Sequence, residues 1–245
     1  MIETYYLGAY WGARQEDAGA CAQRTAHMVR LLEPVDPLFA RWFKSAKSLK
    51  ESLKRPLDSD IDGLRKYIQR VVMKDDCRVP MPDGGFHLWL WNGESGGGDV
   101  WLSIGCGGYW EQANNRCVLR FPEEGLVGER VLSASFQTEV LRAICTAWEP
   151  DWGVATSNVL RDTLEKKSPE VQVGWVTYLS RRLGRVPPLP APVRIEPVGK
   201  LGTLVILTPE RFTTSNPEHL ELAERVRERL DRAGLLQRPE GRSSA

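Results

Sequence analysis

Apolar residues recur along four segments at the spacing of one face of an α-helix. The first of these segments ends before Pro34, because proline cannot continue a helix. The last begins at Pro217, with Asn216 or Ser215 as its N-cap. The pattern predicts four long helices over residues 16–32, 58–73, 133–148 and 217–233, and a short helix over 37–43.

Short runs of aromatic and β-branched residues predict strands. Loops that contain Gly and Asn separate three of these runs in the middle of the chain, which favours an antiparallel meander. The runs cover residues 3–10, 86–91, 99–105, 115–121 and 174–180, and a hairpin is predicted for 193–198 with 202–207. Meanders packed against about four helices indicate an α+β fold with one or more antiparallel sheets. We expect a single domain over residues 1–236 and a flexible C-terminal tail over 237–245.

The composition limits the class of protein. The chain has 245 residues and a mass of 27.6 kDa, which is long enough to bury a sizeable core. Its 42% hydrophobic and 27% charged residues are typical of a globular protein and argue against disorder. The formal net charge is only +1, whereas nucleic-acid-binding domains are usually strongly basic. We therefore expect no direct binding to nucleic acid.

The start of the chain and the cysteines indicate in which cellular compartment the protein lies. Residues 1–12 lack the cationic start and the apolar run of a signal peptide. No stretch approaches 18 consecutive apolar residues, so we expect no membrane association. The five cysteines are odd in number, lie far apart and form no C-x-x-C pair, which is typical of reduced thiols. These features predict a cytoplasmic protein.

A search for catalytic and metal-binding motifs finds none. The three histidines have no partner at the spacing of a zinc-binding helix. The glycine-rich stretch 93–108 contains no Lys and therefore cannot be a P-loop, so glycine-rich hairpin loops are favoured. We predict no cofactor and no metal, and we predict that the chain is not an enzyme. An enzyme whose site combines distant residues, such as Glu111 or Asp151 with His87, stays open as an alternative.

The near-zero net charge conceals two stretches of opposite sign. Residues 41–55 hold six basic residues against one acidic residue, and residues 75–99 hold five acidic residues against one basic residue. A charge run often marks only a solvated loop. The acidic stretch, however, also contains Phe86, Trp89 and Trp91. An acidic rim around aromatic side chains is typical of a surface that binds a basic protein partner.

Several blocks rich in Trp, Gly and Tyr resemble those of a known family. They are Tyr6–Arg14 (YLGAYWGAR), Asp36-Pro37 with Ala40-Arg41-Trp42, Trp148–Ala155 (WEPDWGVA) and Gly174–Ser180 (GWVTYLS). Their content and order are similar to those of the bacterial immunity protein 52 family, over about residues 1–207. The resemblance implies a cytoplasmic protein that binds and neutralises a toxin delivered between bacteria by type VI or related secretion. The toxin implied is a nuclease of the restriction-endonuclease-like class.

The resemblance also implies two modes of inhibition, because a nuclease holds its substrate in a basic cleft. In the first mode, carboxylates that mimic phosphates fill the cleft, and the candidates are Asp75, Asp76, Asp83, Glu94 and Asp99. In the second mode, exposed aromatic side chains and their charged neighbours clamp beside the cleft, and the candidates are Trp11, Arg14, Trp110, Glu111, Asp151 and Trp152. We expect a monomer in the absence of the toxin. A structural or adaptor protein of a secretion system remains an alternative, which would show a large apolar patch and obligate oligomers.

Overall fold

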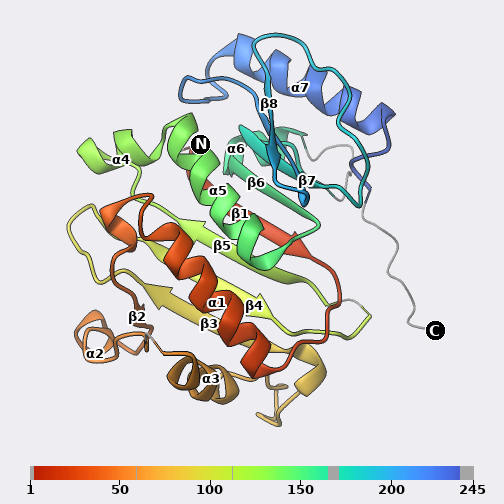
Figure 1. Ribbon diagram of the computed structural model, residues 1–245. Coiled ribbons are helices and arrows are strands. Elements are labelled where there is room, and N and C mark those ends of the chain that lie inside the picture. The colour runs from red at the N-terminus through yellow and green to blue at the C-terminus, as the bar shows by residue number, and fades with distance from the viewer. Residues whose placement is uncertain (1–2, 59, 112, 165–170, 238–245) are drawn as a thin grey trace. The chain divides into compact units, whose positions relative to one another are not determined.

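The computed structural model shows an α+β protein and describes residues 3–58, 60–111, 113–164 and 171–237 (Figure 1). The chain forms two compact units. One unit consists of Tyr10–Pro122, and the other combines the residues up to Ala9 with those from Glu123 onward. The chain passes from one unit to the other within its first strand and again after Pro122.

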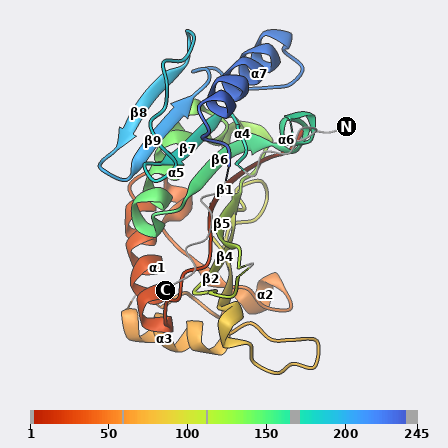
Figure 2. The same ribbon diagram turned by 90° about the vertical axis from the view of Figure 1, so that its right-hand side faces the viewer.

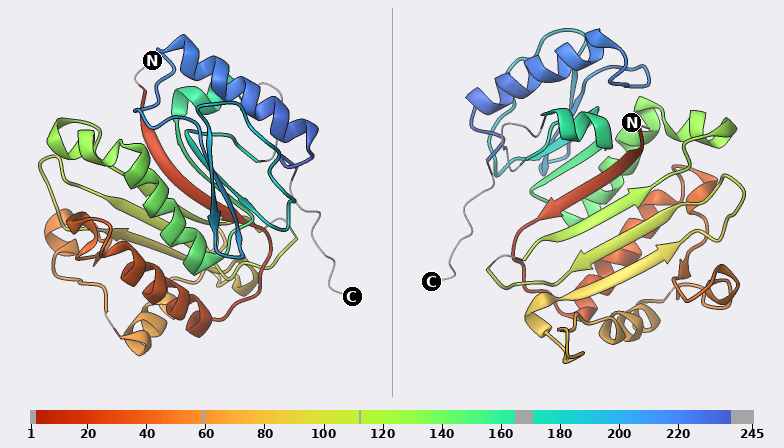
Figure 3. Two further views of the ribbon diagram at one scale, coloured as in Figure 1. Left: turned by 45° about the horizontal axis from the view of Figure 1, so that its top comes forward. Right: turned by 180° about the vertical axis from the view of Figure 1, so that it is seen from behind.

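The Tyr10–Pro122 unit packs helices against antiparallel strands. The strands follow the order β2-β3-β4-β5, and α1 lies across one face of them (Figures 1 and 3). Side chains alternate along the strands, so that Leu88 and Leu90 are buried while Trp89 between them is 53% exposed. The elements of this unit are α1 (Ala18–Leu32), the 3-10 helix η1 (Pro37–Phe39), β2 (Phe43–Lys44), α2 (Leu49–Ser52), α3 (Ile61–Arg70), the 3-10 helix η2 (Pro82–Gly84), β3 (Phe86–Trp91), β4 (Trp101–Cys106) and β5 (Asn115–Arg120).

The other unit places a long helix against its own strands. The strands follow the order β1-β6-β7-β9-β8, and Figure 2 shows β6, β7, β9 and β8 in succession. Helix α5 packs against β6, β7 and β9. The large side chains of Trp148, Trp175, Tyr178 and Phe212 are at most 1% exposed. The elements of this unit are β1 (Tyr5–Trp11), which continues into the first unit, α4 (Gly125–Val131), α5 (Ala134–Trp148), β6 (Trp152–Ser157), α6 (Asn158–Leu164), β7 (Val176–Ser180), β8 (Arg194–Val198), β9 (Gly202–Ile206) and α7 (Pro217–Arg232).

Side chains cap the N-termini of the long helices. Asp17 and Asp60 accept hydrogen bonds of 2.8 and 2.7 Å from the third backbone N–H of α1 and α3. Asn216 caps α7 with a bond of 3.0 Å, so Asn216 rather than Ser215 begins the last helix. Each cap satisfies a backbone N–H that has no partner within the first turn.

The structure confirms the α+β class and the four long predicted helices, which are α1, α3, α5 and α7. Three short helices, α2, α4 and α6, were not predicted. The predicted helix over 37–43 is wrong after Phe39, because Phe43 pairs with Trp91 of β3 instead. The single domain over 1–236 stays a prediction, and the predicted tail lies outside the described residues except for Gln237. Within the described ranges, no helix is long and apolar enough to cross a membrane.

Candidate functional site

Three of the predicted acidic site residues lie at one end of the Tyr10–Pro122 unit. Asp75 and Asp76 follow α3 in a turn, where the Asp75 carboxylate accepts a hydrogen bond of 2.8 Å from the backbone N–H of Val79. Asp83 lies in η2, and its carbonyl oxygen accepts hydrogen bonds from the backbone N–H groups of Tyr109 (2.8 Å) and Trp110 (3.3 Å). We call this region, with the neighbouring Glu111, the acidic end.

The acidic end also presents aromatic surface. The side chains of Tyr109 and Trp110 are 41% and 46% exposed, and Glu111 is exposed beside them. The backbone bonds from Asp83 to these two residues hold the aromatic pair next to the acidic turn. The structure therefore brings Asp83, Trp110 and Glu111 together, although they lie in different parts of the sequence.

The two other acidic candidates lie at the opposite end of the strands. The register pairs Phe86 with Cys106 and Trp91 with Trp101, so the loop after β3 is separated from the acidic end by the strand length. A six-residue strand spans about 17 Å. Glu94 in this loop is 3.1 Å from Arg41, and Asp99 accepts a hydrogen bond of 3.2 Å from the indole of Trp101. The continuous acidic stretch of the sequence is thus two separate groups in space.

The remaining candidates are less exposed than we expected. Trp11 and Trp152 are only 3% and 4% exposed, so the expectation that they are exposed aromatics is wrong. Both are large apolar side chains on strands, and their rings fill the core instead. The Arg14 guanidinium lies 5.0 Å from the centre of the Trp11 ring. Asp151 is 3.7 Å from Arg182. A partner-binding role for these four residues stays a prediction.

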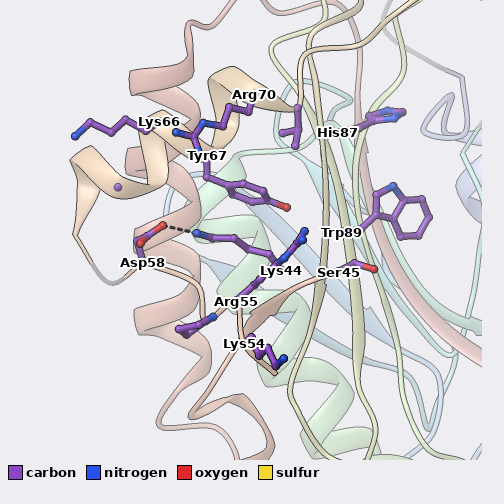
Figure 4. Close-up of a pocket in the computed structure, with 13 residues that line it drawn as sticks. Lys44, Ser45, Lys54, Arg55, Asp58, Lys66, Tyr67, Arg70, His87 and Trp89 are labelled. Carbon is purple, nitrogen blue, oxygen red and sulfur yellow. Dashed lines mark hydrogen bonds and ion pairs between the residues drawn. The ribbon is translucent and has the colours of Figure 1, made fainter. Parts of the chain in front are cut away.

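The structure contains a groove of about 960 Å³ along the outer edge of β3 that the sequence did not reveal (Figure 4). At one end of the groove, Ser45 donates its backbone N–H to the Trp89 carbonyl (2.9 Å). At the other end, His87 donates its N–H to the Val71 carbonyl (3.0 Å). Between these two bonds, Tyr67 of α3 extends toward β3 (Figure 4). The groove is lined by Lys44, Ser45, Lys54, Arg55, Pro56, Asp58, Gly63, Lys66, Tyr67, Arg70, Val71, His87 and Trp89.

This basic groove carries an excess of positive charge. It is lined by five Lys and Arg side chains but by a single carboxylate, that of Asp58. Asp58 is already paired with Lys44 at 2.6 Å, and the Lys44 ammonium lies 5.0 Å from the centre of the Tyr67 ring. Among the residues that the structure describes, the other four cations form no ion pair; they are Lys54, Arg55, Lys66 and Arg70, and all four are exposed.

The aromatic groups of the groove are neutral at physiological pH. Burial raises the pKa of the Tyr67 hydroxyl, although a hydrogen bond from the backbone N–H of Trp89 partly opposes this effect. Burial and the nearby Arg116 lower the pKa of His87. Because Tyr67 stays protonated and His87 stays uncharged near pH 7, only Lys, Arg and Asp58 set the charge of the groove.

The excess of positive charge in the groove suits the binding of anions. Lys and Arg side chains carry N–H donors that suit carboxylate or phosphate oxygens, and the exposed Trp89 ring offers an apolar surface beside them. Among the described residues, no group of three or more His, Cys, Asp or Glu side chains is arranged to hold a metal ion. Part of the lining of this groove lies in the basic run at 41–55, but no pattern in the sequence indicated that α3 and β3 complete it.

Comparisons with known proteins identify the family to which the chain belongs. The solved structure of the Pseudomonas aeruginosa T6SS protein PA0821 is similar in fold, with a TM-score of 0.50 and 12% sequence identity. The alignment covers 100% of this chain and 78% of that chain. No curated protein sequence matches the chain. A sequence model of the family described as immunity protein 52 matches residues 3–239, which is nearly the whole chain. Immunity proteins inhibit toxins without being enzymes, and this chain belongs to the immunity protein 52 family.

Proposed function

We propose that the chain protects a bacterium by binding one cognate toxin of a type VI secretion system and blocking its activity. The family match over residues 3–239 carries this proposal. The fold shared with a protein that is itself described as a T6SS protein supports the choice of secretion system. We further propose that the toxin is a nuclease and that the chain acts on it as a monomer in the cytoplasm, where nucleic acid is the target.

The acidic end is our candidate for the contact with the toxin cleft. A nuclease must attract phosphates, so its cleft is basic and is complementary to Asp75, Asp76, Asp83 and Glu111. The exposed Trp110 is bonded through its backbone N–H to Asp83 and precedes Glu111, and it supplies the large aromatic side chain that binding hot spots favour. Glu94 and Asp99 lie at the far end of β3 and β4, so we assign them at most a peripheral contact.

Co-expression with the toxin tests this function. We expect the wild-type chain to restore growth of cells that express the toxin from a neighbouring open reading frame, and to co-purify with it. Replacing Asp75, Asp76 and Asp83 by Lys should slow association, while Trp110→Ala should weaken binding by about 2–4 kcal/mol.

The matched control reverses three exposed carboxylates elsewhere, with Glu33→Lys, Glu51→Lys and Glu129→Lys. This control should protect as well as the wild type. Failure of the wild-type chain to restore growth, with both proteins soluble, would overturn the proposed function. Equal association rates for the two triple variants would overturn only the assignment to the acidic end.

A further inference from the structure

We propose that the basic groove binds a short acidic segment of the toxin, as a second contact separate from the acidic end. This inference rests on the proposed function, because it assigns the occupant to the same toxin. The two contacts differ in chemistry, since the basic groove would bind carboxylates of the toxin whereas the acidic end would bind its cations.

The first argument is the uncompensated charge of the groove. The groove's one carboxylate is paired with Lys44, which leaves four cations around a single groove, two from the segment after α2 and two from α3. Like charges held close together repel one another, and an anion placed among them relieves this repulsion. Figure 4 shows Lys54 and Arg55 on one side of Tyr67 and Arg70 on the other, so the charge surrounds the groove rather than marking one edge.

The second argument is the aromatic lining of the groove, where Tyr67 lies between the cations and Trp89 lies to one side of them (Figure 4). Trp89 is 53% exposed although it lies on a paired strand, and its backbone N–H is fixed by the hydroxyl of Tyr67. A Trp side chain has only two rotatable bonds and so loses little conformational entropy on binding, and its exposed ring suits an apolar side chain of a peptide. The groove therefore suits a ligand that carries carboxylates next to an apolar group, as an acidic protein segment does.

The third argument is the limited length of the basic groove. Helix α3 has ten residues and is therefore about 15 Å long, which equals four or five residues of an extended peptide. Acidic residues lie toward both ends of this helix: Asp60 is its N-cap, Asp62 lies in its first turn, and Asp75 and Asp76 follow it in the chain. A longer polyanion, such as a nucleic-acid strand, would meet these carboxylates, whereas a short acidic peptide would not.

A direct binding measurement tests the groove without the toxin. The probe is a fluorescein-labelled peptide of six glutamates, titrated with the full chain and followed by anisotropy. We expect binding that weakens as salt is added, because exposed charges are screened. The variant with Lys54→Glu, Arg55→Glu and Arg70→Glu should lose at least about tenfold in affinity.

The matched control reverses three exposed cations outside the groove, with Arg30→Glu, Lys47→Glu and Lys50→Glu, two of which belong to the same basic run. It should change the affinity by less than about threefold. If the groove variant does not fold, the neutral pair Lys54→Gln and Arg70→Gln replaces it. Absence of peptide binding, equal affinity of both variants, or tighter binding of a labelled six-nucleotide thymidine strand would each overturn the proposal.

Co-expression with the toxin separates this inference from the function on which it rests. If the wild-type chain does not protect the cell, both proposals fail. If the wild-type chain protects and the groove variant protects equally well, the function stands and the groove assignment fails. Loss of protection in the groove variant alone, with peptide binding also lost, is the result that we expect.

Discussion

At the scale of single residues, one carboxylate connects three segments of the same unit. Glu3 precedes β1, and it accepts hydrogen bonds of 2.6 Å from the hydroxyls of Ser157 and Thr213. A third hydrogen bond of 3.2 Å comes from the backbone N–H of Thr214. Burial raises the pKa of Glu3, but these hydrogen bonds outweigh it and bring the pKa below its ordinary value. The folded protein therefore favours the ionised form.

This preference predicts a pH-dependent effect of Glu3→Gln. Because the pKa is lower in the folded state, the carboxylate stabilises the protein above the unfolded value of about 4.3 and loses this effect as the pH falls further. We expect the variant to lower the free energy of unfolding by about 1–2 kcal/mol at pH 7, since the group is partly exposed and hydrogen bonds to charged groups are strong. The difference should shrink below about pH 4.

Urea unfolding of both proteins between pH 3.5 and pH 7 measures this difference. Glu224→Gln, on the exposed face of α7, is the control and should have little effect at any pH. An equal loss of stability for Glu3→Gln across the whole pH range would contradict the role of the ionised carboxylate.

At the scale of elements, helix α3 both packs against the rest of its unit and forms one side of the basic groove. Its buried side chains Leu64 and Ile68 lie on one face, and α3 packs against α1. Lys66, Tyr67 and Arg70 recur at helical spacing toward the groove. A change that loosens α3 therefore displaces half of the groove.

The N-cap of α3 gives a prediction at this scale. Asp60 accepts a hydrogen bond of 2.7 Å from the backbone N–H of Gly63. Asp60→Ala removes the cap, whereas Asp60→Asn keeps it, and both variants remove the same charge. We expect Asp60→Ala to be less stable than Asp60→Asn by about 1 kcal/mol. Hydrogen exchange of the α3 amides should be faster in Asp60→Ala, and equal exchange in both variants would show that the cap contributes nothing.

The long helices and strands could be predicted from the sequence because each repeats a pattern of apolar and polar residues along its length. Helix α5 has four turns of apolar spacing, and β3 was predicted with its observed bounds. Helices α2, α4 and α6 have four to seven residues, which is too short for a period to be recognised. The two-residue strand β2 depends on pairing with β3 and with Pro56, which are distant in the sequence, and such pairing leaves no local pattern.

The site was less predictable than the fold because it depends on distant contacts. The acidic stretch 75–99 appeared continuous, but the hairpin of β3 and β4 sends its two halves to opposite ends. Lys54, Arg70 and Trp89 all line the basic groove, although they come from three different elements or loops. Charge runs along the sequence therefore identified some of the charged residues, but neither the contribution of Arg70 from α3 nor the grouping in space.

At the scale of the whole molecule, the net charge of +1 results from separate regions of opposite sign. The acidic end and the basic groove lie on the same compact unit, Tyr10–Pro122. Two regions of opposite sign on a partner surface fix its orientation, because a reversed partner would face like charges. A toxin that uses both contacts would therefore bind in one orientation.

The cysteines provide a test of where the toxin binds. Cys77 is exposed and lies between Asp76 and Arg78 at the acidic end, whereas the other four cysteines are buried. Burial also raises the pKa of Cys106 and Cys117, which suppresses their reactive thiolates. We expect dithiobis-nitrobenzoate to modify one thiol per native chain rapidly and the remaining thiols only after unfolding. Cys77→Ser should abolish the rapid phase.

Bound toxin should slow the rapid modification of Cys77 at least about tenfold if the toxin covers the acidic end, whereas serum albumin should not. Unchanged labelling of Cys77 in the purified complex would place the toxin away from the acidic end.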